Sequence, residues 1–442
     1  MVKVITYGTF DVLHEGHIRL LRRAKALGDY LIVGVTGDDF DLSRGKINNR
    51  QSLSDRIKAV RETGLADQII VEEYDGQKID DVRKYGVDVF TVGSDWEGKF
   101  DYLRDYCKVV YLPRTEGVSS TEIRAKSRML RIGMVGEVKF IKKYIRESTF
   151  VNGCIAAAAC SSDERFLGEL DVPFKTSDYD ELLDRVDAVY VASHPSLHYE
   201  QIKKAIEKGK HVLCESPIAL SEEDCDELFA LAEEKGVILA DAIKTAYSTA
   251  YTRMLLLVKS GAIGKPVAVD ATCTSLTEID DRPDYFSTKW NSSCEWGPTA
   301  LLPVFQILGC DYKDVRLSSV FADKDKTFDR FSKMDFTFNG AVATVKVGSG
   351  VKSEGELIVS GTNGYVYVPA PWWKTDYFEI RRENTTENKR YFYQLDGEGI
   401  RYEIVAFVKA VENGKMTDCV PREISKAICS VVSGKNRNEI VL

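Results

Sequence analysis

The sequence predicts an α/β protein in which two parallel sheets are followed by a sheet of antiparallel strands. Up to about residue 125, apolar strands alternate with amphipathic helices, and a second series of the same kind starts near residue 131. Repeated alternation of strands and helices is typical of a doubly wound parallel sheet. From about residue 267, apolar and polar residues alternate along each strand instead. That change of pattern indicates an antiparallel sheet.

The elements of the first series follow from short apolar runs separated by amphipathic segments. In order, they are a strand at 3–7, a helix at 17–27, a strand at 30–36, a helix at 54–62, a strand at 68–72, a helix at 80–85, and strands at 87–92 and 109–112. The basic segment 123–131 then leads into the second series.

The second series starts with a strand at 131–135, which a helix follows. Its later elements are a strand at 153–159, a helix at 179–185, a strand at 188–192, a helix at 199–208, a strand at 212–214, a helix at 222–235 and a strand at 237–240. The alternating strands lie at 267–272, 335–338, 342–347, 356–360 and 365–368, and a closing helix at 402–411. We therefore expect three domains, at 1–128, 129–245 and 246–442.

Composition excludes several classes of protein. A chain of 442 residues can bury two or three full cores without metals or disulfides. Its ten cysteines form no CxxC pair and no zinc-spaced cluster, which favours a reduced cytoplasmic protein without a metal site. The first residues lack a signal-peptide pattern, and no apolar run reaches the roughly 18 residues of a membrane span. A net charge of −8 without a long basic run disfavours nucleic-acid binding.

The richest stretch, between the first strand and the first helix, is Gly8-Thr9-Phe10-Asp11-Val12-Leu13-His14-Glu15-Gly16-His17. Ligands of open α/β sheets bind at the carboxyl ends of strands, where this stretch lies. Glycines let the backbone approach a phosphate, and the first turn of a helix offers free N–H groups. Two histidines can donate to phosphate oxygens as charge builds up in a transfer reaction. The alternative is a glycine-bearing turn with two surface histidines.

This stretch resembles the signature GTFDxxHxGH of the cytidylyltransferase superfamily, in which both histidines stabilise the α-phosphate of the nucleotide. The runs 92–101 and 111–121 look like those of the glycerol-3-phosphate cytidylyltransferases of teichoic-acid synthesis, and the likeness covers residues 1–125. It implies transfer of CMP from CTP, with Mg²⁺, to a small polyol phosphate. Glycerol 3-phosphate is the default acceptor, and the products are then CDP-glycerol and pyrophosphate, for teichoic acid or capsule polymers.

The resemblance also implies roles for particular residues. It makes His14, His17 and Lys46 catalytic and assigns the acceptor phosphate to Arg44, Arg56 and Lys78. The implied nucleotide-binding residues are Thr9, Phe10, Asp11, Gly16, Asp95, Arg114, Thr115, Ser119, Ser120 and Thr121. Asp11 is a candidate Mg²⁺ ligand, without a dedicated carboxylate cage.

Two of these segments can also be explained without any role in ligand binding. The run Ser119–Glu122 has the form of a capping box, which opens a helix whether or not it binds phosphate. The basic segment with Arg44, Lys46 and Arg56 could be a solvated charge run. Arginine at 44 also departs from the family's lysine, which keeps the charge and changes the donor geometry.

Residues 131–442 resemble the glucose-fructose oxidoreductase, inositol dehydrogenase and MocA family. The likeness rests on the segments 187–198, 205–217, 260–264 and 360–366. It implies an NAD(P)-binding Rossmann domain followed by an α/β domain with an open antiparallel sheet.

Three positions that carry the chemistry of that family differ in this chain. Val138 stands at the second glycine of the GxGxxG turn that starts here at Gly136. Glu215-Ser216-Pro217 replaces Glu-Lys-Pro, and Glu295-Trp-Gly-Pro-Thr299 replaces Asp-x-Gly-x-His. Serine and threonine cannot replace a titrating lysine and histidine. We therefore expect a vestigial site at Gly136, Glu215, Ser216, Glu295 and Thr299.

Several interpretations of this second half stay open. It could be a structural or oligomerisation module, a binder of a nucleotide or sugar, or an active oxidoreductase that makes or consumes the polyol phosphate. Whether it uses NAD(P) is open as well. The whole chain could also be a scaffold built from two inactive enzymes. Both families imply a homodimer.

Overall fold

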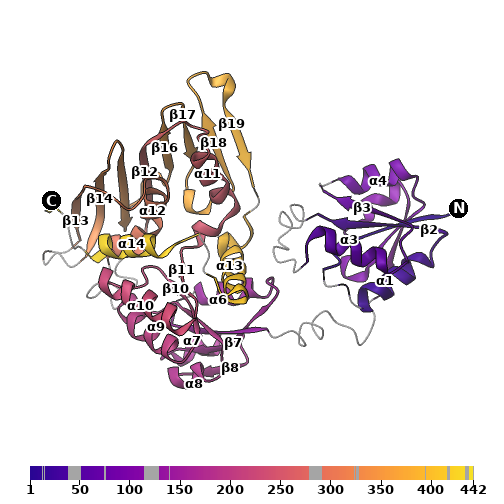
Figure 1. Cartoon of the computed structure of the whole chain (residues 1–442), viewed down its shortest axis with the longest axis horizontal. Helices are drawn as coiled ribbons and strands as arrows, with labels where there is room; N and C mark the ends of the chain where they lie inside the picture. Colours follow the sequence, from indigo (N-terminus) through magenta and orange to yellow (C-terminus); the bar gives the residue numbers. More distant parts are fainter. Residues whose placement is uncertain are drawn as a thin grey trace. The chain divides into compact units, whose positions relative to one another are not determined.

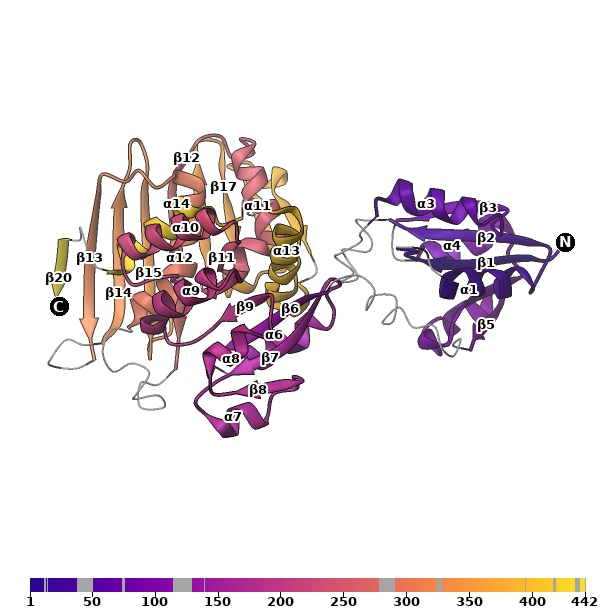
Figure 2. The same cartoon turned by 60° about the horizontal axis from the view of Figure 1, so that its bottom comes forward.

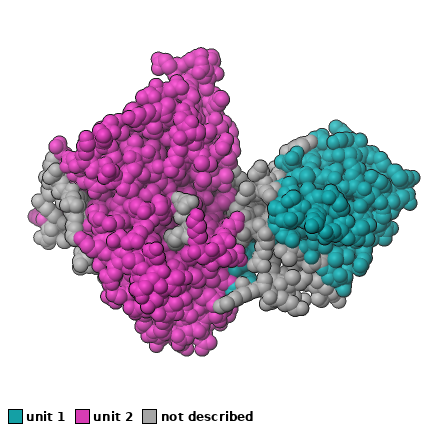
Figure 3. All heavy atoms as spheres, viewed as in Figure 1, with its two compact units in different colours: residues 1–129, 150–153 teal, residues 130–149, 154–442 magenta. Residues whose placement is uncertain are grey.

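The computed structural model describes residues 1–11, 13, 15–37, 51–73, 76–113, 129–138, 140–277, 291–322, 324, 328–393, 395–415, 419–433 and 438–441, without the side chains of 95, 396 and 438–441. These residues form two compact units (Figure 3). The first contains residues 1–129 and 150–153, and the second contains residues 130–149 and 154–442.

The first unit is a five-stranded parallel sheet with the strand order β3-β2-β1-β4-β5 (Figure 1). Its elements are β1 (Lys3–Gly8), α1 (Glu15–Lys25), β2 (Tyr30–Thr36), α3 (Leu53–Glu62), β3 (Gln68–Glu72), α4 (Gln77–Tyr85), β4 (Val89–Gly93), the 3₁₀ turns η1 (Ser94–Trp96) and η2 (Asp101–Asp105), and β5 (Lys108–Leu112). The predicted doubly wound sheet is therefore confirmed.

Alternation along the strands gives this sheet two apolar faces. Val4 of β1 packs with Leu21 of α1 and Val60 of α3 on one face. Its neighbour Ile5 packs with Val82 of α4 and Leu103 of η2 on the other face. Because successive side chains of a strand point to opposite faces, helices are needed on both sides.

The second unit begins with a six-stranded parallel sheet of order β11-β10-β9-β6-β7-β8. Its strands are β6 (Leu130–Val135), β7 (Cys154–Cys160), β8 (Phe174–Thr176), β9 (Ala188–Val191), β10 (His211–Glu215) and β11 (Leu239–Ala242). The helices are α6 (Phe140–Ser148), α7 (Glu164–Gly168), α8 (Tyr179–Leu183), α9 (His198–Glu207) and α10 (Glu222–Lys235). This sheet is the predicted Rossmann architecture.

A nine-stranded sheet of order β19-β18-β17-β16-β12-β15-β14-β13-β20 completes the second unit (Figure 2). Its strands are β12 (Pro266–Ser275), β13 (Asp314–Phe321), β14 (Asp329–Thr337), β15 (Val342–Ser349), β16 (Leu357–Gly361), β17 (Gly364–Val368), β18 (Tyr377–Arg381), β19 (Lys389–Phe392) and β20 (Asn438–Val441). Most neighbours are antiparallel, as predicted. The pairs β12–β15 and β13–β20 are parallel, so the sheet is mixed.

Helices connect the two sheets of the second unit. The 3₁₀ turns η4 (Lys244–Tyr247) and η6 (Trp372–Lys374) and the helices α11 (Thr249–Lys259), α12 (Ser292–Leu308), α13 (Ile400–Asn413) and α14 (Arg422–Ser433) complete its main elements. Helix α12 packs on β12 and β15, and α14 packs on both α12 and α10. None of the helices in the described ranges is long and apolar enough to cross a membrane.

Candidate functional site

The sheet order places the first candidate site at the switch point of the first unit. β1 pairs with β2 on one side and with β4 on the other, so the chain leaves this point in two directions. Ligands of open α/β sheets bind outside the carboxyl ends of such a strand pair. Gly8 ends β1 and Gly93 ends β4. The stretch 8–17 and the run 92–101 therefore meet at one edge of the sheet.

The loop after β1 is held by backbone geometry and local contacts. Phe10 has a φ of +52°, which is unusual for a residue with a side chain, and its ring is 1% exposed. That ring packs edge-on against His17, with the ring centres 5.6 Å apart. Asp11 Oδ1 accepts a hydrogen bond of 3.0 Å from the Gln51 amide. The Phe10 ring thus packs against His17, which lies in the first turn of α1 just after the carboxyl end of β1.

Arg56 lies under this loop with a side chain that is 0% exposed. Its Nη1 donates to the carbonyl oxygens of Thr9 at 2.7 Å and Thr36 at 2.9 Å. The guanidinium thus joins the carboxyl ends of β1 and β2. In this structure its contacts support the loop, and the predicted contact with the acceptor phosphate stays a prediction.

Removing Arg56 should destabilise the first unit. Arg56→Met leaves the buried carbonyls of Thr9 and Thr36 without their donor, and we expect a loss of roughly 2–4 kcal/mol in the free energy of unfolding. Hydrogen exchange of the β1 and β2 amides in increasing urea measures this loss. The exposed Arg61→Met on the same helix should change it by less than about 0.5 kcal/mol. Equal effects of the two substitutions would contradict the supporting role.

Lys78 occupies a buried position on α4. Its ammonium pairs with Glu72, and both side chains are almost fully buried. The hydroxyl of Thr36 donates to the same carboxylate at 3.0 Å, and the Tyr7 ring lies 4.7 Å from the Lys78 nitrogen. The structure therefore gives Lys78 a charged partner within the protein. Its predicted role at the acceptor phosphate remains untested.

Several predicted residues lie outside the described part of the chain. They are His14, Arg44, Lys46, Arg114, Thr115, Ser119, Ser120 and Thr121, together with the capping-box helix. Asp95 is described in its backbone, in η1 after β4. Thr9 follows β1 at the switch point, and Gly16 lies in the first turn of α1. Within the described residues, no group of three or more His, Cys, Asp or Glu side chains could hold a metal ion.

A second candidate site is a cavity of about 250 Å³ in the second unit. It lies at the carboxyl ends of the Rossmann strands, and α12 forms one wall. Glu215, Ser216, Glu295 and Thr299, four of the five predicted vestigial residues, all line it. The other lining residues are Val138, Phe140, Ala192, Ser193, Pro195, His198, Ala242, Ile243, Lys244 and Pro298.

The turn after β6 departs from the dinucleotide fingerprint at its second and third glycines. Gly136 has a φ of +122°, and a Cβ there would lie 2.4 Å from the Ala192 carbonyl oxygen, so this glycine is required by the turn. Val138, at the second glycine of the fingerprint, puts a branched side chain on the cavity wall. Ile141, at the third, is fully buried where a glycine allows close helix packing. The first glycine of the fingerprint is therefore kept, and branched side chains stand at its second and third positions.

Burial shifts the pKa values of two titratable groups of this cavity, Glu215 and His198, toward their neutral forms. Burial raises the pKa of Glu215 to about 7, and Tyr190 donates its hydroxyl to this carboxyl. Burial lowers the pKa of His198 to about 4, and both ring nitrogens face carbonyl oxygens, of Pro217 at 2.9 Å and Ser193 at 3.0 Å. His198 is thus a neutral structural residue. Ser349 donates to Glu295 at 2.8 Å.

Titration of Glu215 should make the stability of the second unit depend on pH. Its folded-state pKa lies above the usual value of 4.5, so the folded protein binds more protons and becomes less stable as pH rises from about 4.5 to 7. In Glu215→Gln, we expect the free energy of unfolding to fall by roughly 3 kcal/mol less over this pH range than in the unaltered chain. Urea unfolding at pH 4.5 and pH 8, followed by tryptophan fluorescence, measures it. The exposed Glu234→Gln is the control, and equal pH slopes in both variants would refute the assignment.

The sequence analysis missed four groups at or beside this cavity: the buried Tyr190, Asp241 and Glu403, and Lys244, which lines the cavity and is partly exposed. Burial raises the pKa of Asp241 to about 6, and Ser425 donates to it at 2.7 Å. Burial and the nearby Glu215 raise the pKa of Glu403. Lys244 lies two residues after the end of β11, so its place after a parallel strand was the one signal available.

The folds and sites together define a nucleotidyltransferase domain joined to an oxidoreductase fold. Residues 5–126 match the family described as cytidylyltransferase-like, and residues 130–242 match the oxidoreductase family with an NAD-binding Rossmann fold. The chain is 52% identical to glycerol-3-phosphate cytidylyltransferase of Bacillus subtilis and 50% identical to that of Bacillus spizizenii. Each match spans 124 residues, which are 28% of this chain and 95% of the relative.

The chain therefore belongs, through its first unit, to the glycerol-3-phosphate cytidylyltransferase-like nucleotidyltransferases, and it carries a C-terminal Gfo/Idh/MocA oxidoreductase module. The second half shares its fold with KijD10, a 3-ketoreductase from Actinomadura kijaniata solved with NADP and TDP-benzene. That match has a TM-score of 0.63 and 20% identity, and it covers 71% of this chain and 99% of the other.

Proposed function

We propose that the first unit transfers CMP from CTP to glycerol 3-phosphate and releases pyrophosphate. The observation that carries this proposal is the 50–52% identity to glycerol-3-phosphate cytidylyltransferases over nearly their whole length. The placement of His17 and of the run 92–101 at the switch point of the sheet supports it. The product is then CDP-glycerol.

The reaction needs no covalent intermediate. A phosphate oxygen of the acceptor attacks the α-phosphorus of CTP in line, a new P–O bond forms, and the bond to pyrophosphate breaks. Positioning and charge stabilisation supply most of the rate. His14 and His17 stabilise the α-phosphate, while Lys46, Arg44 and Arg114 neutralise the remaining phosphate charge. Mg²⁺ enters with CTP.

The second half is, in this proposal, a redox-impaired module. The groups at the cavity support it, because serine and threonine occupy the places of a titrating lysine and histidine, and Val138 on the cavity wall stands where the fingerprint has a glycine. The proposal also places the domain boundaries after residues 128 and 245. It further includes a cytoplasmic homodimer and a product that is used for teichoic-acid or capsule polymers. An active reductase that makes the polyol phosphate is the alternative, favoured only by the preserved fold.

Acceptor choice tests the proposal most cheaply. Pyrophosphate release from CTP is measured with glycerol 3-phosphate, glycerol 2-phosphate and glycerol, each with Mg²⁺. We expect release with glycerol 3-phosphate at least tenfold faster than with its isomer, and none with glycerol. Faster release with glycerol 2-phosphate would keep the transferase and change its substrate.

A further inference from the structure

Three lysines of the second unit meet on one carboxylate beside the cavity. Glu398 lies 2.6 Å from the Lys143 nitrogen, 2.9 Å from that of Lys374 and 3.4 Å from that of Lys244. These lysines come from α6, η6 and η4, three elements that are far apart in sequence. We call Lys143, Lys244 and Lys374 the lysine cluster.

The charges of this cluster do not balance. Three ammonium groups face the single carboxylate of Glu398. The neighbouring Glu147 pairs with Arg401 at 3.0 Å, so it adds no net charge. Among the ion pairs of the described residues, three ammonium groups of this cluster therefore share one carboxylate, and like charges at this distance repel one another.

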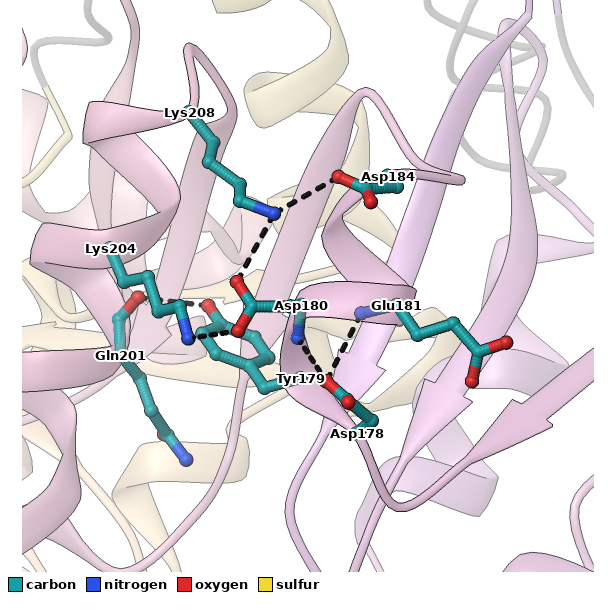
Figure 4. A network of polar contacts seen from close by, with 8 residues as sticks. All are labelled: Asp178, Tyr179, Asp180, Glu181, Asp184, Gln201, Lys204 and Lys208. Carbon is teal, nitrogen blue, oxygen red and sulfur yellow. Dashed lines mark hydrogen bonds and ion pairs between the residues drawn. The ribbon is translucent and has the colours of Figure 1, made fainter.

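A surface network of the same unit shows the balanced case (Figure 4). Lys204 and Lys208 contact Asp180, and Lys208 also contacts Asp184 at 3.0 Å. Two ammonium groups there meet two carboxylates. In the lysine cluster, by contrast, three ammonium groups share one carboxylate.

The backbone around Glu398 has an unusual conformation where its carboxylate contacts the lysines. Gly397, Glu398 and Gly399 have φ values of 58°, 55° and 92°, and Glu398 is a non-glycine residue in this left-handed region. A Cβ at Gly399 would lie 2.8 Å from the Lys244 carbonyl oxygen, so the loop passes close to η4. Such a conformation persists only where the surroundings enforce it, and it concentrates at ligand sites.

Lys244 connects the cluster with the cavity. Its side chain is 20% exposed, its nitrogen lies 4.8 Å from the centre of the Phe140 ring, and it lines the cavity with Glu215, Ser216 and Thr299. Burial lowers the pKa of Lys244, while Glu398 opposes that shift. An anion held by the cluster would therefore leave the rest of its molecule among hydroxyl and carboxyl groups that can bond to a hydroxyl or a carbonyl.

We propose that the lysine cluster binds the dianionic phosphate of a small phosphomonoester, whose hydroxylated remainder occupies the cavity of the second unit. A phosphate with a charge near −2 balances the three lysines and Glu398, and Lys is well suited to bind phosphate as a point charge. This site is separate from the acceptor site of the first unit. It makes the oxidoreductase-like half a receptor for a phosphorylated polyol.

Hydrogen exchange of the full-length chain tests the proposal, because it reports on each unit separately. Glycerol 3-phosphate should protect peptides that cover residues 140–148 and 397–404 in a saturable way, and uncharged glycerol should not. Lys244→Gln and Lys374→Gln should each weaken the apparent affinity at least tenfold. Glu398→Gln should strengthen it several-fold, because the competing carboxylate is removed.

The lysine variants should lower the affinity and Glu398→Gln should raise it, and these opposite changes distinguish an effect on binding from a general loss of stability. Lys208→Gln, from the balanced network, is the matched control and should keep the unaltered affinity. The proposal would be overturned if glycerol 3-phosphate did not protect the second unit. Equal protection in Lys244→Gln, Lys374→Gln and the unaltered chain would also overturn it. So would weaker binding by Glu398→Gln. Loss of transferase activity would leave these readouts unaffected, since the peptides belong to the second unit.

Discussion

Replacing His17 by alanine should reduce CTP-dependent pyrophosphate release about 10²–10³-fold. His17 lies in the first turn of α1 at the switch point, and its ring is held against Phe10. A donor aimed at the α-phosphate stabilises charge that develops only in the transition state, so kcat should fall more than the KM for CTP rises. Initial rates over a range of CTP concentrations, with saturating glycerol 3-phosphate, measure both constants.

His194→Ala provides the matched control, since this histidine is a partly exposed residue of the second unit. Its rate should equal that of the unaltered chain. If His17→Ala kept the full kcat, the HxGH stretch would be the glycine-bearing turn with surface histidines that the sequence also allows. A raised KM with unchanged kcat would make His17 a binding residue only.

Replacing Val138 by glycine should tighten the binding of NADPH or NADH at least tenfold. Val138 lines the cavity at the point where a dinucleotide fingerprint has the glycine that lets pyrophosphate approach. Removing its side chain reopens that approach, while Gly136 still makes the turn. Enhancement of the nicotinamide fluorescence on titration measures the dissociation constants.

A graded series strengthens this test. Val138→Ala keeps a Cβ and should fall between the unaltered chain and Val138→Gly. Micromolar binding by the unaltered chain, unchanged in both variants, would show that Val138 does not crowd the cofactor. The redox-impaired interpretation of the second half would then lose its main steric support.

The sequence predicted much of the fold because its signals were local. The strands β2 and β3 are short apolar runs and α10 is a long helical run, so these elements were predicted with the bounds that the structure has. Helix α12 was not predicted, because Pro298 and Pro303 interrupt its pattern. Tertiary packing against β12 and β15 holds it as a helix. The parallel pairs β12–β15 and β13–β20 depend on long-range pairing that no local pattern records.

The candidate sites divide in the same way. The stretch 8–17 carries its chemistry within ten residues, so it could be found without a structure. Arg56 and Lys78 were chosen for their charge, but their burial against Thr9, Thr36 and Glu72 depends on the fold. The lysine cluster could not be predicted from the sequence for a related reason. Its members are separated by more than a hundred residues each, and only the folded chain brings them to Glu398.

The most direct test of the account is to identify the product by mass spectrometry after the full-length chain is incubated with CTP, Mg²⁺ and glycerol 3-phosphate. NADH is present in a parallel sample, and its absorbance is followed. The account predicts CDP-glycerol and pyrophosphate in equal amounts, with the NADH absorbance unchanged. Failure to form a CDP-linked product with any polyol phosphate would contradict it.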